Sequence, residues 1–159
     1  MIIFEANRII NQKELHVENA FLDKDRMFLP EYAGIYFVFV GSVEHFHDET
    51  FKMKAPRLIY IGQAKNINSR HNADNGSPAH EHYEDFDNER GNGEEIAYAF
   101  APVGNLFDRL LIESSLIYQF KPCINIKDKY KFTHRPTRIK IESDIEFPYA
   151  GTHDVEQAK

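Results

Sequence analysis

The chain has 159 residues, of which 42% are apolar and 13% aromatic, which is enough for one compact domain with an ordinary hydrophobic core. No apolar run approaches the roughly 20 residues of a membrane-spanning helix, and the first residues lack the basic start and cleavage site of a signal peptide. We therefore expect a cytoplasmic protein without membrane association. Cys123 is the only cysteine, which excludes an internal disulfide and a cysteine-rich zinc site.

The net charge of −6 disfavours a protein that binds nucleic acid mainly through its overall charge, because phosphate contacts normally use Lys and Arg. The charge is unevenly distributed. Between Lys127 and Lys140 six cationic side chains oppose one acid, whereas Glu81 to Glu95 contains seven acids and one arginine. Ordinary solvated surfaces also show such runs. If nucleic acid binds, we expect the basic segment to contact it and the acidic segment to lie away from it.

Two strands are predicted in the first half of the chain. Residues 33–40 form a nearly continuous β-branched and aromatic run that is typical of a buried strand, and residues 57–62 form a second one. The polar residues between them, 43–56, predict a long connection, so the two strands should pair antiparallel. Residues 1–30 contain short apolar clusters without a sustained period, and no element is assigned there.

A short helix, a loop and a third strand are expected next. Asn66 can cap a helix that runs past Arg70 and ends at the turn-forming residues 74–78. Residues 78–94 are polar and contain glycine, which predicts an irregular loop. The alternating pattern of residues 95–101 predicts a strand.

The clearest helix follows, from Gly104 and Asn105 to Phe120. Its predicted apolar stripe includes Leu106, Leu110, Ile117 and Phe120. Glu113 falls inside that stripe, where a carboxylate is out of place. It is either a functional acid or an acid at the edge of an apolar face that pairs with Lys or Arg.

These residue types suit phosphodiester hydrolysis, which needs an activated water, neutralisation of the phosphate charge and help for the leaving oxygen. Glu113 could hold one Mg²⁺ that keeps most of its waters. Arg70 could bind phosphate through its planar guanidinium. Tyr36 or Tyr60 could act as a base if a cation lowered a pKa that is normally about 10. Taken singly, each is better explained as a surface arginine, a core tyrosine or a paired acid.

The order of these residues is more specific than any one of them. The chain contains, in sequence, Gly34-Ile35-Tyr36, Tyr60-Ile61-Gly62, Arg70, Glu113 and Asn125. This order resembles the GIY-YIG nuclease family over about residues 33–127. Residues 60–66 and the stretch that ends at Asn125 are especially similar to the N-terminal nuclease domain of the bacterial excinuclease.

The resemblance implies an α+β fold, an α/β sandwich in which a small three-stranded antiparallel sheet is flanked by helices. It divides a single domain, 1–159, into a catalytic module at 33–127, an N-terminal extension at 1–32 and a basic C-terminal extension at 128–159, with a further addition in the hairpin. It implies a metal-dependent endonuclease that hydrolyses DNA phosphodiester bonds with one Mg²⁺ or Mn²⁺ on Glu113.

The resemblance also implies roles for single residues. Tyr36 would be the base or a base relay, Tyr60 would hydrogen-bond the water or the phosphate, and Asn125 would support the site. His71 is a further catalytic candidate, because the short helix places it close to Arg70. The candidate nucleic-acid contacts are Arg70, Gln63, Lys65, Arg135, Arg138 and Lys140.

The sequence departs from the family pattern in three ways. Tyr36 and Tyr60 are separated by 23 residues, Gln63 stands where excinuclease-like members have lysine, and Asp74 stands where a Tyr or His often follows the arginine. A histidine could replace that missing side chain, and the candidates are His71, His80 and His82. The His80-x-His82 and His45-x-His47 pairs lack the further ligands of a structural zinc site and are expected to be solvent-exposed.

Two alternatives to a DNA endonuclease stay open. One is a noncatalytic nucleic-acid-binding or interaction domain on the same scaffold, and the other is a family member that cleaves RNA. Double-strand cleavage with one site per chain would need two chains or two encounters, so a homodimer is possible.

Overall fold

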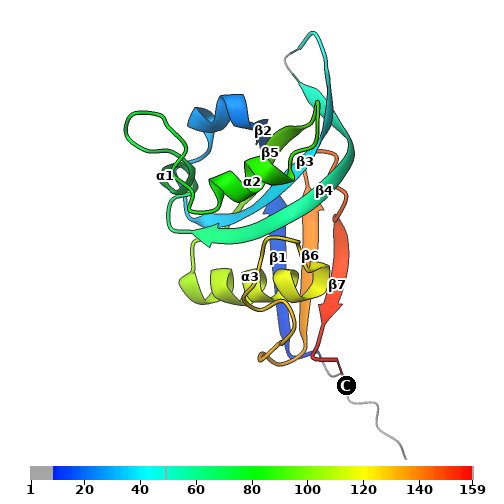
Figure 1. Cartoon of the computed structure of the whole chain (residues 1–159). Helices are drawn as coiled ribbons and strands as arrows, with labels where there is room; N and C mark the ends of the chain where they lie inside the picture. The colour runs from blue at the N-terminus through cyan, green and yellow to red at the C-terminus, as the bar shows by residue number, and fades with distance from the viewer. Residues whose placement is uncertain (1–8, 49, 159) are drawn as a thin grey trace, which may run out of the picture.

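The structure is a computed structural model of the chain and describes residues 9–48 and 50–158. Two β-sheets and one long helix form its core (Figure 1). The larger sheet has four antiparallel strands in the order β2 (Asn19–Leu22), β5 (Glu95–Pro102), β3 (Gly34–His45) and β4 (Phe51–Ala64). The expected sheet of three strands is therefore wrong in number, because a strand from the N-terminal segment joins it.

The second sheet is built entirely from the two ends of the chain. Its order is β1 (Asn11–Val17), β6 (Thr137–Ser143) and β7 (Gly151–Val155). β1 and β6 pair in parallel, whereas β6 and β7 pair antiparallel. Figure 1 shows the blue strand β1 beside the orange strand β6. The two terminal segments thus form one layer of the same molecule.

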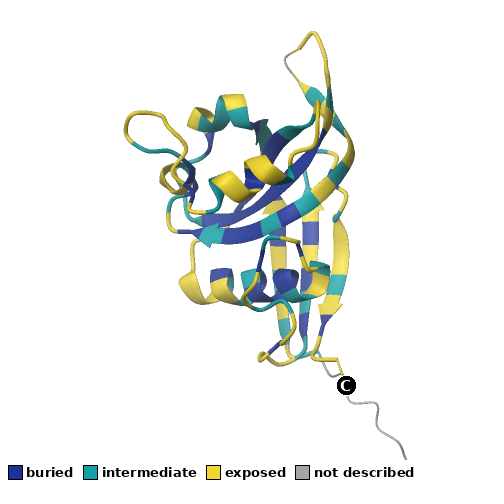
Figure 2. Cartoon of the chain, viewed as in Figure 1, coloured by how far each residue is buried: buried dark blue, intermediate teal, exposed yellow. Residues whose placement is uncertain are grey.

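The central strand β3 is buried on both faces, which explains its continuous apolar sequence. Ile35, Phe37 and Phe39 pack in one cluster with residues of α3 (Leu106–Phe120) and of the second sheet. The alternate residues Tyr36 and Val38 pack in a second cluster under the short helices. Figure 2 shows the buried residues concentrated along this strand and its neighbours.

The predicted strands and their antiparallel pairing are confirmed, but the predicted long connection is wrong. β3 continues to His45 and β4 begins at Phe51, so the polar residues form the arms of a longer hairpin joined by residues 46–50. Register shifts follow Val38 and Val40, and Ala55 has a positive φ of 45°. These irregularities are typical of β-bulges, which increase the twist of an exposed hairpin.

Three helical segments cover the face of the four-stranded sheet that carries Tyr36. They are the 3-10 helix η1 (Asp23–Phe28), α1 (Ile67–His71) and α2 (Tyr83–Glu89). The helix expected after Asn66 is present, and the Asn66 side-chain oxygen caps it by accepting a hydrogen bond from Ser69 N, but the helix ends at His71, before the predicted turn at 74–78. The loop expected at 78–94 is wrong, because α2 forms there around the fully buried Phe86.

The long helix expected from residue 104 to Phe120 is confirmed as α3, with the Asn105 side chain as its N-cap. The predicted stripe is buried only in its second half. Leu106 is 50% and Leu110 41% exposed, whereas Ile117 is buried. In the described part of the chain, no helix is long and apolar enough to cross a membrane.

Candidate active site

The two tyrosines of the paired motifs lie on one face of the β3–β4 hairpin. Tyr36 is opposite Gly62, and Tyr60 is opposite Val38, so the tyrosines are diagonal neighbours with ring centroids 6.2 Å apart. A Cβ atom on Gly62 would lie 2.2 Å from Tyr36 Oη. Glycine is therefore required at position 62 because the Tyr36 phenol occupies the space above it.

Both tyrosines are protonated near neutral pH in the protein alone. Tyr36 is 1% exposed, and burial raises its pKa well above the usual value, with the charges of Tyr60 and Glu113 adding to the rise and Arg70 opposing it. Burial likewise raises the pKa of Tyr60 to about 12. The two phenols are therefore hydrogen-bond donors in this state.

Arg70 lies at the end of α1 and is exposed. Within residues 9–48 and 50–158 its guanidinium has no ion-pair partner. Its positive charge acts on Tyr36, Tyr60 and Glu113, opposing the effect of burial on the pKa of each. The Arg70 charge thus acts on the tyrosine pair and is not neutralised by a carboxylate of the described residues.

Glu113 extends from α3 toward the end of β4 and is half-buried. Burial raises its pKa to about 7, a hydrogen bond from the Gln63 backbone N–H opposes this, and the Asp128 charge adds to it. Lys127 and Arg70 act on the carboxylate at longer range, but no salt bridge joins it to a described cation. Carboxylate lone pairs are therefore available for another ligand.

Asn125 fixes the segment after α3 to β4. Its Nδ2 donates to Ile61 O and its Oδ1 accepts from Ile61 N, both at 2.9 Å, and the side chain is buried. Ile61 lies between the motif residues Tyr60 and Gly62. The two hydrogen bonds from Asn125 pair its backbone as a neighbouring strand would. The supporting role expected for Asn125 stays a prediction, and this geometry favours it.

A buried histidine also contacts the tyrosine pair. His80 Nε2 lies 2.8 Å from Tyr36 Oη, and His80 Nδ1 accepts a hydrogen bond from His82 N at 3.0 Å. The His80 side chain is 5% exposed, and burial lowers its pKa to about 3, with Arg70 and His82 adding to the effect. The expectation that His80 is solvent-exposed is therefore wrong, because α2 covers it with Phe86, whose ring centroid lies 4.9 Å away.

His71 is also buried beside Tyr36, with ring centroids 4.5 Å apart in an edge-on arrangement. Burial lowers its pKa well below the usual value. Among the described residues neither ring nitrogen has a hydrogen-bond partner. The catalytic role expected for His71 stays a prediction, and the observed contacts are those of a packed, neutral ring.

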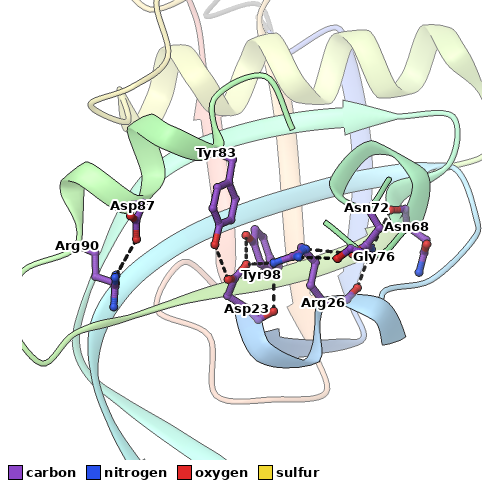
Figure 3. A network of polar contacts seen from close by, with 9 residues as sticks. All are labelled: Asp23, Arg26, Asn68, Asn72, Gly76, Tyr83, Asp87, Arg90 and Tyr98. Atoms are coloured by element: carbon purple, nitrogen blue, oxygen red, sulfur yellow. Dashed lines mark hydrogen bonds and ion pairs between the residues drawn. The ribbon is translucent and has the colours of Figure 1, made fainter. Parts of the chain in front are cut away.

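A polar network on the same side ties the three helical segments to the sheet (Figure 3). Asp23 accepts hydrogen bonds from Tyr83 Oη at 2.6 Å, Tyr98 Oη at 2.7 Å and Arg26 Nη1 at 2.7 Å. Arg26 also donates to Asn72 Oδ1 at 3.0 Å, just after α1. The elements that carry Arg70 and His80 are thus held against β5.

The structure places the other predicted nucleic-acid contacts in two regions. Gln63 follows Gly62 in β4, and its side-chain oxygen accepts from Arg109 Nε at 3.0 Å. Lys65 is exposed just beyond β4. Gln63 therefore lies on the strand that supplies Tyr60, and Lys65 directly follows that strand.

The basic C-terminal residues lie elsewhere. Arg138 and Lys140 alternate along β6 with Ile139 and Ile141, which pack in the core shared with α3. They therefore face away from that core and are not brought to the tyrosine pair. Arg138 is paired with Asp154 at 2.7 Å and Lys140 with Glu142 at 3.1 Å, while Arg135 is exposed. Their role in binding stays a prediction.

From the sequence, His80 is only one of three candidates to replace the missing side chain and is not predicted to be catalytic. The missed signal was α2, since Tyr83 and Phe86 are the only apolar residues in an acidic segment and their spacing is that of one helix face. Once that helix packs through Phe86, the residues before it must run over the tyrosines.

No family model and no curated protein matches the chain. Solved structures of the GIY-YIG N-terminal endonuclease domain of UvrC from Thermotoga maritima are similar to it. A point mutant of that domain bound to its catalytic divalent cation has 22% sequence identity and a TM-score of 0.41, over 65% of this chain and 93% of that one. A second such mutant gives 22% identity and 0.40 over the same shares. At these values the likeness does not establish the family of this chain.

Proposed function

We propose that this chain is a GIY-YIG nuclease that hydrolyses phosphodiester bonds of DNA with one bound divalent cation. The observation that carries the proposal is the grouping of two phenols, a guanidinium and a carboxylate at Tyr36, Tyr60, Arg70 and Glu113, the last two without an ion-pair partner among the described residues. Ion pairs within the protein would have neutralised Arg70 and Glu113. Because neither has an ion-pair partner among the described residues, their charges favour a ligand that combines a phosphate with a cation.

The donor set fits Mg²⁺ or Mn²⁺. No group of three or more potential ligands from His, Cys, Asp and Glu occurs in the described part of the chain, so Glu113 would be the sole protein ligand of its type. Mg²⁺ dehydrates reluctantly and tolerates a site with one carboxylate and several waters. When bound, the cation would polarise the phosphate and lower the pKa of a bound water.

The protein residues would then orient the substrate. Arg70 would bind phosphate oxygens through its fork of N–H groups, which no described carboxylate occupies. Tyr60 would donate its proton to a phosphate oxygen or a water. Tyr36 would exchange a proton with the attacking water once the positive charge in the site lowers its raised pKa.

The proposal is tested by incubating the purified full chain with supercoiled plasmid and Mg²⁺. We expect nicking that EDTA and Glu113→Gln abolish. The matched control is Glu84→Gln, which changes an exposed glutamate on α2 and should nick like the wild type. Undiminished nicking by Glu113→Gln would refute the role of Glu113. Metal-dependent cleavage of RNA alone would reassign the substrate, and binding without cleavage would make the chain a noncatalytic member.

A further inference from the structure

The geometry points to His80 as a positioning residue that donates its Nε2–H to Tyr36 Oη and thereby leaves the Tyr36 proton free to point toward the substrate. This inference rests on the proposed function for its kinetic consequence. Its structural part concerns the resting protein and can be tested without any activity.

The hydrogen-bond direction follows from the two partners of the His80 ring. Nδ1 lies 3.0 Å from the backbone N of His82, which can only donate, so Nδ1 must be the unprotonated nitrogen. A neutral imidazole carries one proton, which is then on Nε2. Nε2 lies 2.8 Å from Tyr36 Oη, so the phenol oxygen is the acceptor in this bond.

The surroundings keep His80 neutral. It is buried under Phe86, and the other rings against it belong to Tyr36, Tyr60, His71 and His82. Arg70 is the charged group that acts on it, and together with burial and His82 it keeps the pKa at about 3. His80 is therefore neutral near neutral pH, and both of its ring nitrogens are already engaged, Nδ1 with His82 N and Nε2 with Tyr36 Oη.

The consequence for Tyr36 is an assigned direction for its proton. Because Tyr36 Oη accepts from His80, its own O–H must use another acceptor. Inside the protein the phenol lies over Gly62, which offers no side chain. Among the described residues Tyr36 Oη has no hydrogen-bond partner besides His80, so its proton is left for a water or a substrate oxygen. If Tyr36 becomes a phenolate during the reaction, the His80 N–H donates to a charged acceptor and stabilises it.

The sequence offers a reason for this arrangement. Asp74 stands at the position where a Tyr or His often follows the family arginine, and His80 comes six residues later. His71 is closer in sequence to Arg70, but neither of its ring nitrogens has a hydrogen-bond partner among the described residues. His80 is the histidine whose nitrogen reaches the Tyr36 hydroxyl.

The first test is ¹⁵N NMR of the full chain labelled in its histidine rings. We expect one ring, assigned by its loss in His80→Gln, to be neutral from pH 5 to 8 with its proton on Nε2. A proton on Nδ1, or titration of that ring within this range, would overturn the inference. This result stands even if the protein cleaves nothing, so it separates failure here from failure of the proposed function.

The second test compares two substitutions by plasmid nicking. His80→Gln keeps an N–H donor near Nε2, whereas His80→Leu fills similar space without one. We expect His80→Leu to lower kcat by roughly 10–100-fold with little change in KM, because a donor to a charged acceptor is lost. We expect His80→Gln to retain most of the activity. Equal losses in both variants would assign His80 to packing and contradict the inference.

A third measurement covers the case in which His80→Leu folds poorly. Titration of ¹³C-labelled tyrosine rings in the wild type and His80→Gln should show similar ionisation of Tyr36. The folded fraction of His80→Leu should show a higher Tyr36 pKa, since the phenolate has lost a donor. An unchanged Tyr36 pKa in His80→Leu would count against the hydrogen bond as a functional contact.

Discussion

Glu113→Gln should stabilise the fold at alkaline pH while it abolishes activity. The pKa of Glu113 is raised from 4.5 to about 7. The folded protein therefore holds the proton more tightly than the unfolded chain, and the wild type loses stability as the pH rises from 4.5 through 7. A difference between 4.5 and about 7 corresponds to roughly 3 kcal/mol at about 1.4 kcal/mol per tenfold change in proton affinity. Solvent screens part of the charge on this half-buried side chain, so we expect about 1–2 kcal/mol.

Urea denaturation at pH 4.5 and pH 8, in EDTA, measures this difference. The variant and the wild type should have similar free energies of unfolding at pH 4.5, and the variant should be more stable at pH 8. Other titrating groups, including the buried histidines, are common to both proteins and cancel. Glu84→Gln, the exposed control on α2, should follow the wild type at both pH values. Mg²⁺ should stabilise the wild type and not Glu113→Gln at pH 8. Parallel curves for wild type and Glu113→Gln would refute an unpaired carboxylate at this position.

Three further predictions concern the scaffold and the basic segment. Gly62→Ala should destabilise the fold by about 1–3 kcal/mol and abolish nicking, because its Cβ would lie 2.2 Å from Tyr36 Oη; Gly104→Ala, where a Cβ meets nothing within 4 Å, is the control, and similar urea midpoints for the two would contradict the steric argument. Asn125→Ala should cost about 2–4 kcal/mol in the same assay, since it leaves both backbone groups of Ile61 without partners; a loss below about 0.5 kcal/mol would show that water replaces them. Replacing Arg135, Arg138 and Lys140 by Gln should weaken DNA binding and flatten its salt dependence. The salt slope should change by less than the loss of three full phosphate contacts would give, because Arg138 and Lys140 are already paired with acids. An unchanged salt slope would reject the segment as a phosphate contact.

The parts of the fold that could be predicted are those that local sequence determines. The strand at 33–40 is recognisable because both of its faces are buried, and the helix to Phe120 because Asn105 caps it. The candidate cluster was predictable from residue order alone, and the structure brings Tyr36, Tyr60 and Arg70 into one electrostatically coupled group. The order of these residues in the sequence gives no distances between them, so only the structure shows that their side chains are close.

The parts that could not be predicted depend on contacts between distant residues. β1 pairs with β6 from Asn11 to Val17 against Thr137 to Ser143, and a parallel pair of this kind leaves no turn signal in the sequence. The hairpin arms are hard to distinguish from a loop because exposed two-stranded segments contain polar residues on both faces. In each case the partner, and not the local pattern, determines the element.

The stripe on α3 shows how such a contact changes the meaning of a residue. Leu106, Leu110, Glu113 and Ile117 share one helix face, and the sequence predicts that all of it is buried. The structure buries Ile117 but leaves Leu106 and Leu110 exposed, because the buried face of α3, which carries Arg109, Ile112 and Leu116, is rotated away from this stripe. Glu113 therefore lies at the edge of the buried face, where burial raises its pKa to about 7 while the half-buried side chain keeps contact with solvent. A carboxylate fully inside the stripe would have had to be neutral or paired, so its position at this edge is what makes a hydrated metal site at Glu113 physically reasonable.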